Sequence, residues 1–243
     1  FMGRHLPSLL LVLTCVAGAQ AQTIGLLGGS LTIEEGTTLQ LSGPLEFVIQ
    51  PGASVINNGT MDLGMEASLT EPDGGPIHGS GVEMARTTGN GPFASIEPAA
   101  LGLTISGDAQ SGPVTVIRGH TTSYFPEGDP SIARWYTIEA PLGGSGPLDV
   151  VLRYDASELN ALSGTTLGLF RSEAGNGPWS AVVGTNDAGN RTVSAILLAP
   201  WATITAFDAD APTASPTLLA QDGLHVWPTL TIGDVHINAQ DGK

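Results

Sequence analysis

The chain has few of the residues that crosslink small exported proteins or bind polyanions. Of its 243 residues, one is a cysteine and eight are Lys or Arg, against 23 Asp or Glu. A single cysteine forms no internal disulfide, so hydrophobic cores must hold the fold. At a formal net charge of −15, the chain also lacks the clustered cations that nucleic acids and anionic membranes require. The acidic residues are scattered singly, as on a solvated surface.

Long apolar runs and helical periodicity are scarce as well. The apolar run at residues 6–16 is far shorter than the roughly 20 residues of a membrane-spanning helix. The best helical segment, residues 155–162, is at most two turns. What the chain has instead is 33 Gly, 17 Pro and many Thr and Val, which is typical of short strands joined by tight turns. The composition therefore predicts an all-β fold.

The N-terminus has the pattern of an export signal. Arg4 precedes the apolar run, and a small-residue Ala-x-Ala site follows it. We expect residues 1–21 to be a signal peptide, and the residues at its cleavage site are Ala19, Ala21 and Gln22. Lipidation at Cys15 is the alternative. The predicted location is secreted or on the outer cell surface, with no transmembrane span after signal removal.

Residues 22–92 contain an internal repeat. The pattern of Leu31, Ile33 and Gly36 recurs at a spacing of 16, ending at Gly52, and a third copy begins at Leu63. Apolar residues two apart share one face of a strand, and glycine suits the turns. The repeat predicts a β-solenoid-like segment, with a pair of hairpins as the alternative. Residues 72–92 are rich in Gly and Pro, which predicts a loop or boundary.

Residues 93–207 predict an antiparallel β-sandwich of immunoglobulin-like type. Short apolar runs with turn signals between them follow one another along this segment. These runs are residues 101–105, 114–118, 132–138, 148–154, 166–171, 179–183, 193–198 and 203–207. The aromatic residues expected in the core are Trp135, Tyr136, Phe170, Trp179 and Trp201.

The sequence predicts neither a catalytic site nor a cofactor. His78, His120, His225 and His236 are scattered without metal-ligand spacing. Paired carboxylates, such as those of a glycosidase, are the one catalytic alternative, and the visible pairs are Asp155 with Glu158 and Asp208 with Asp210. Calcium is the one alternative cofactor, because oxygen ligands from Asp208, Asp210, Asp222 and Asn238 suit that ion.

Four arginines recur once per predicted strand, at positions 118, 134, 153 and 171. One interpretation is a basic stripe that recognises an acidic glycan or partner. The favoured interpretation is cross-strand ion pairing with Asp149, Asp155 or Glu139 on a solvated sheet face.

Several of these segments resemble a known module. Arg118-Gly119-His120, Ala133-Arg134-Trp135-Tyr136, Leu152-Arg153-Tyr154-Asp155 and Leu169-Phe170-Arg171 are similar to a β-sandwich unit of long secreted surface proteins of Bacteroidetes. The resemblance covers about 110 residues. Such proteins are typically adhesin-like and exported by the type IX secretion system.

The C-terminal tail extends this resemblance. After a linker at residues 208–220, residues 221–243 resemble the start of a small β-rich type IX sorting domain, although Thr229-Leu230 replaces the usual Asn-Pro. The residues that carry the likeness are Leu224, Val226, Trp227, Pro228, Gly233, Val235 and Ile237. Sorting domains of this family run on further, so we expect the chain to be a fragment. An edge strand of a third small domain is the alternative.

Together these features predict a non-enzymatic cell-surface or secreted protein, adhesin-like or structural. Its expected partners are the type IX secretion machinery, through the tail, and a cell-surface polysaccharide or glycan. One alternative is a carbohydrate-binding accessory module, which would expose Trp or Tyr on a sheet face. The other is a β-rich hydrolase, which would bring two acids together across a cleft.

Overall fold

The computed structural model describes residues 12–13, 22–87, 92–107, 113–125, 128–139, 146–198 and 202–210. Within them the fold is all-β, as predicted, with two short 3-10 turns, η1 (Pro98–Ala100) and η2 (Ala156–Glu158). The sorting-motif residues and Trp201 lie outside the described residues. So do Ala19 and Ala21, whereas Gln22 begins the first strand of the solenoid.

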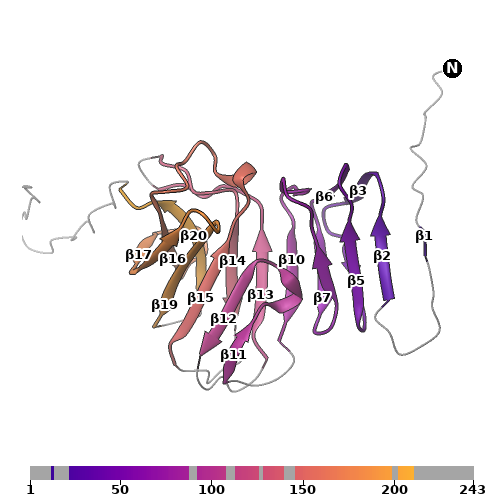
Figure 1. Cartoon of the computed structure of the whole chain (residues 1–243), viewed down its shortest axis with the longest axis horizontal. Coiled ribbons are helices and arrows are strands. Elements are labelled where there is room, and N and C mark those ends of the chain that lie inside the picture. Colours follow the sequence, from indigo (N-terminus) through magenta and orange to yellow (C-terminus); the bar gives the residue numbers. More distant parts are fainter. Residues whose placement is uncertain are drawn as a thin grey trace, which may run out of the picture.

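The N-terminal part is a parallel β-solenoid in which each coil contributes one strand to each of three sheets (Figure 1). The first sheet contains β2 (Gln22–Leu26), β5 (Leu45–Ile49) and β8 (Ser68–Thr70). The second contains β3 (Gly29–Ile33), β6 (Ala53–Asn57) and β9 (Ile77–His78). The third begins with β4 (Thr38–Gln40), β7 (Thr60–Gly64) and β10 (Val82–Arg86). A short β1 (Val12–Leu13) pairs antiparallel with β2 at the open end.

The solenoid is present, but the predicted spacing of 16 is wrong. Strand partners in adjacent coils are 22 residues apart at Thr38 and Thr60, and 24 apart at Leu31 and Val55. The first copy of the motif covers β3 and β4, while the second covers β5 and β6. The motif therefore repeats from one side of the solenoid to another, because every side is a strand followed by a turn. The predicted loop at residues 72–92 contains β9 and β10 of the third coil.

The turn after β6 is packed inside the solenoid. The Oδ1 atom of buried Asn57 accepts a hydrogen bond from the Gly59 amide at 3.1 Å. A Cβ atom added to Gly59 would lie 2.4 Å from the Thr37 carbonyl oxygen and 2.5 Å from that of Glu34. These oxygens belong to the backbone of the preceding coil, so a side chain at position 59 would force the coils apart.

We expect Gly59→Ala to lower the free energy of unfolding by roughly 1–3 kcal/mol, the usual cost of overpacking. The control is Gly28→Ala, because a Cβ at Gly28 has nothing within 4 Å; this change should stay within about 0.5 kcal/mol of the original chain. Urea denaturation measures both variants. Equal effects of the two substitutions would contradict the described packing of the coils.

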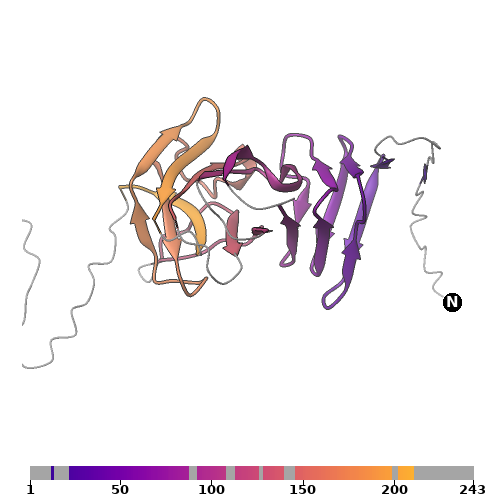
Figure 2. The same cartoon turned by 90° about the horizontal axis from the view of Figure 1, so that it is seen from below.

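The third solenoid sheet continues directly into the sandwich. Strand β10 pairs antiparallel with β13 (Thr115–Gly119), and the sheet reaches eight strands in the order β17-β16-β20-β14-β13-β10-β7-β4. The added strands are β14 (Trp135–Glu139), β16 (Leu167–Ser172), β17 (Ser180–Val182) and β20 (Thr203–Asp208). One unbroken ladder of backbone hydrogen bonds thus joins the solenoid to the sandwich (Figures 1 and 2).

A five-stranded antiparallel sheet packs against the sandwich part of this sheet. Its strands, in spatial order, are β11 (Phe93–Ile96), β12 (Leu103–Gly107), β15 (Leu148–Arg153), β19 (Thr192–Leu197) and β18 (Gly184–Asp187). All eight predicted runs contain a strand. Strand β18 was missed because its sequence, Gly-Thr-Asn-Asp, has no apolar alternation.

The main core runs from the solenoid into the sandwich. Met61, Ala85, Val116 and Ile204 belong to one buried cluster and are all fully buried. A second, aromatic cluster lies beside the main core and consists of Phe125, Phe170, Trp179 and Phe207. Tyr136, Phe170 and Trp179 are buried as predicted, whereas Trp135 is only half-buried.

Candidate functional site

Six charged side chains gather where the solenoid meets the sandwich. They are Glu71, Glu83, Arg118, His120, Arg134 and Glu158, which we call the junction cluster. The side chains of Glu83 and Arg118 are completely buried, and the most accessible member, Glu71, is 16% exposed. The group links the solenoid strand β10, the sandwich strand β13 and the turn η2.

The Glu83 carboxylate is the acceptor at the centre of this cluster. It accepts hydrogen bonds from Arg118 Nε at 3.0 Å, from His120 Nε2 at 2.7 Å and from Asn57 Nδ2 at 2.7 Å. Burial alone would raise the pKa of Glu83, but Arg118 and His120 together with these hydrogen bonds lower it to about 2. Arg118 also donates to Glu71 Oε2 at 2.6 Å. Glu83 is therefore ionised at neutral pH although it is completely buried.

Glu158 forms the sandwich side of the cluster. Its Oε1 atom accepts from Arg134 Nε at 2.8 Å, and its Oε2 atom accepts from the Asp155 amide at 2.8 Å, which completes the capping box of η2. His120 Nδ1 lies 3.8 Å from Glu158 Oε1. Burial alone would lower the pKa of His120, but Glu83 and Glu158 raise it above the ordinary value. With His120 protonated, three carboxylates face three cations, so the cluster is neutral.

The arginine prediction is right about ion pairing and wrong about its place and partners. Arg118 and Arg134 are buried in the junction cluster and do not lie on a solvated face. Arg153 pairs with Glu97 at 3.1 Å and Arg171 with Glu173 at 2.7 Å. In the described residues none of the four pairs with Asp149, Asp155 or Glu139, because neighbouring strands and turns supply other carboxylates. A sequence signal did exist, since Glu83 occupies an inward position of an apolar strand.

The predicted carboxylate pairs do not form sites. Asp155 caps η2 and accepts from the Gly74 amide, and Glu158 is bound by Arg134. Asp208 accepts a hydrogen bond from the backbone of Asp210. Within the described part of the chain, no three His, Cys, Asp or Glu side chains are grouped to hold a metal ion. Asp222, Asn238, His225 and His236 lie outside the described residues. No helix in that part is long and apolar enough to cross a membrane.

The outer face of the eight-stranded sheet carries two adjoining hollows, of about 450 and 600 Å³. Gly175 borders both of them. We call this surface the outer groove; it is defined by Tyr124, Trp135, Thr137, Glu139, Glu173 and Asn176. Trp135, Thr137 and Glu139 are alternate residues of β14 and share its outer face, whereas Tyr136 and Ile138 point into the core.

Trp135 is held in place at one end of the groove. It pairs across the ladder with Gly119, and a Cβ atom on Gly119 would lie 2.3 Å from the indole carbons. The indole therefore lies over the backbone of β13, where no side chain intervenes. Its Nε1 atom donates to Thr121 Oγ1 at 2.9 Å. The ring is thus oriented by packing and by its only hydrogen-bond donor.

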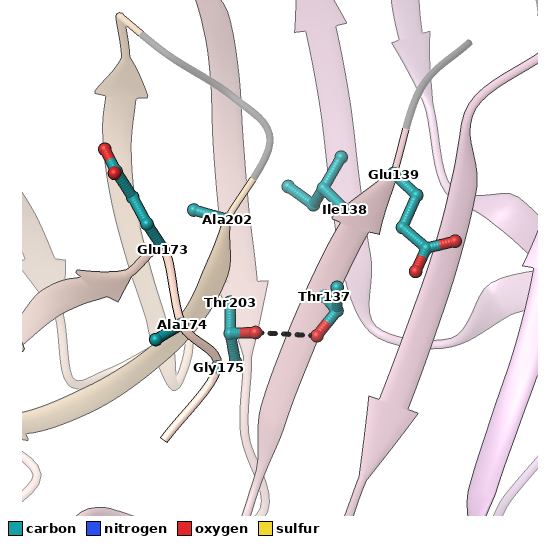
Figure 3. Close-up of a pocket in the computed structure, with 8 residues that line it drawn as sticks. All are labelled: Thr137, Ile138, Glu139, Glu173, Ala174, Gly175, Ala202 and Thr203. Atoms are coloured by element: carbon teal, nitrogen blue, oxygen red, sulfur yellow. Dashed lines mark hydrogen bonds between the residues drawn. The ribbon is translucent and has the colours of Figure 1, made fainter. Parts of the chain in front are cut away.

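The other end of the groove is polar. The hydroxyl groups of Thr137 and Thr203 hydrogen-bond to each other at 2.8 Å, and Glu139 and Glu173 flank this pair on opposite sides (Figure 3). Both carboxylates are exposed, and the side chain of Glu173 is 82% exposed. Sequence reasoning assigned Trp135 to the core, but strand parity could have identified its outward position.

No protein-family model, curated protein or solved structure matches this chain.

Proposed function

We propose that the chain is an exported, non-enzymatic, adhesin-like protein that presents a binding face outside the cell. One observation carries this proposal: a single eight-stranded sheet runs from the solenoid through the sandwich. Neighbouring strands are about 4.8 Å apart, so the sheet spans roughly 34 Å. A solenoid joined to a sandwich by a hydrogen-bonded ladder suits the display of an extended surface.

The junction cluster supports the same proposal. The shared core and the ion pairs of Arg118 with Glu83 and Glu71 tie the two parts together. A flexible linker would leave the orientation of the parts free, whereas paired strands and buried ion pairs restrict it. The resemblance to secreted Bacteroidetes proteins and to the type IX sorting domain supplies the route: export, and recognition of the tail by that machinery.

A carbohydrate-binding role is the second candidate, because Trp135 and Tyr124 lie at the surface of one sheet face. The hydrolase alternative has less support. Glu139 and Glu173 share the outer groove, but a glycosidase needs one carboxylic acid sheltered from solvent so that it keeps its proton. Both carboxylates here are exposed.

The test is surface display in a bacterium that has type IX machinery. Cells that express the full chain should be labelled by an antibody to the sandwich without permeabilisation. Cells expressing the chain without residues 226–237 should lose this labelling and retain the protein inside. Trp135→Ala is the matched control, since it alters the groove and should leave display unchanged. Undiminished surface labelling of the deletion variant would contradict the proposed route.

A further inference from the structure

We propose that the outer groove binds an uncharged polysaccharide chain, with a sugar ring stacked on Trp135 and sugar hydroxyls bound at the polar end. The inference rests on the proposed function, because it names the ligand class of the displayed face. It is argued from the fixed indole, the second aromatic residue, the shape of the groove and its charge.

The fixed indole is the first argument. Gly119 lies beneath Trp135, and Thr121 holds the indole nitrogen at 2.9 Å. The half-buried ring still borders the groove. The face of an aromatic ring carries negative charge, which attracts the weakly positive C–H bonds of a sugar ring. Because the indole is already oriented, binding costs little side-chain entropy.

A second aromatic residue and hydrogen-bonding groups surround this platform. Tyr124 is 60% exposed and borders the same hollow as Trp135. The hydroxyl groups of Thr122 and Ser123 and the amide of Asn176 also line it. An apolar surface with a few placed polar groups is the usual composition of a small-molecule site. The arrangement fits a ligand with one apolar face and many hydroxyl groups.

The shape of the groove favours a chain over a single sugar. The two hollows meet at Gly175, and the outward residues of β14 run along them from Trp135 to Glu139. At about 3.3 Å per residue, this row is roughly 13 Å long. A ligand that contacts both the indole and the carboxylates must therefore extend along the strand.

The charge of the groove favours an uncharged ligand. Among the described residues that line it, Glu139 and Glu173 carry charge and no lysine or arginine does. Arg171, next to Glu173 in the sequence, donates to that carboxylate at 2.7 Å. Carboxylates accept hydrogen bonds from sugar hydroxyls and repel uronic acids or sulfated sugars. With a formal net charge of −15, the whole chain adds to this repulsion.

The experiment is titration calorimetry of the purified full chain with neutral hexasaccharides of β-1,4-linked glucose, mannose and xylose, and with an oligogalacturonate. We expect at least one neutral hexasaccharide to bind and the oligogalacturonate not to bind. Trp135→Ala should weaken binding about tenfold or more, as loss of a central aromatic contact does. Tyr124→Ala should weaken it about threefold to tenfold. Val183→Ala is the control, because Val183 is 96% exposed and lies outside the groove, and its affinity should be unchanged.

Thermal unfolding of each variant accompanies the titrations, and Tyr124→Ala keeps the test valid if Trp135→Ala does not fold. Absence of binding to all neutral hexasaccharides would overturn the inference. So would tighter binding of the oligogalacturonate, affinities that ignore both aromatic substitutions, or a groove occupied by a second copy of the chain or by a peptide. The titrations do not depend on export. Failed binding with intact surface display overturns this inference alone, and failed display with intact binding overturns the proposed export route alone.

Discussion

Replacing Arg118 by methionine is expected to lower the free energy of unfolding by about 3–5 kcal/mol, the usual cost of removing one partner from a buried ion pair. The substitution would leave Glu83, whose side chain is completely buried, and Glu71 without the guanidinium that now lies 3.0 and 2.6 Å away. Methionine has a similar length, so the loss would report the charge and hydrogen bonds more than the packing. Urea denaturation, with Trp179 fluorescence as one probe, measures the effect.

The matched control is Arg153→Met. Arg153 also pairs with a glutamate, Glu97 at 3.1 Å, but its side chain is 58% exposed. Exposed ion pairs contribute at most about 1 kcal/mol, so this variant should unfold close to the original midpoint. Similar losses for the two arginines would show that burial does not set the strength of the junction cluster.

Raising the pH above about 6.5, the ordinary pKa of histidine, is expected to destabilise the protein through His120. The pKa of His120 is raised in the folded state, because the Glu83 and Glu158 carboxylates outweigh its burial. In this pH range the folded chain holds a proton that the unfolded chain has lost. Stability then falls as the pH rises. The contribution is complete below the unfolded pKa and is lost as the pH passes the folded pKa.

Glu83 acts in the opposite direction at low pH. Its folded pKa is about 2, against an ordinary value of 4.5. Its contribution is therefore present above about pH 4.5 and is lost as the pH falls toward 2. The two residues together predict maximal stability of the junction between about pH 4.5 and 6.5.

The measurement is the unfolding free energy as a function of pH for the original chain and for His120→Gln. The substitution should flatten the profile above about pH 6.5. His78→Gln is the control, because His78 is exposed on β9, and it should leave the slope unchanged. Identical slopes for the original chain and the His120 variant would contradict the charge balance assigned to the junction cluster.

Local patterns were sufficient for the strands but not for the solenoid coils. The run at residues 148–154, for example, alternates as a half-buried strand does, and β15 occupies it. The repeat of Leu31 and Phe47 looked like one coil because each side of the solenoid has the same strand-and-turn pattern. Which side a strand joins depends on contacts more than 20 residues apart, such as that of Leu31 with Val55.

The two candidate sites required the fold. Glu83 and Arg118 lie on strands that pair only once β10 meets β13. The sequence indicates that each charge is unusual within an apolar strand, but it does not name the partner. Trp135 could be placed outside by parity with Tyr136 and Ile138. That it lies over Gly119 becomes visible only from the register of β13 and β14.

The most direct test of a displayed glycan-binding surface is adherence of intact cells to an immobilised neutral polysaccharide, chosen from the titrations. Cells that express the original chain should adhere. Cells that express Trp135→Ala should show the same antibody labelling and adhere about tenfold less, in line with the loss of a central contact. Equal adherence of the two strains at equal surface labelling would contradict the account.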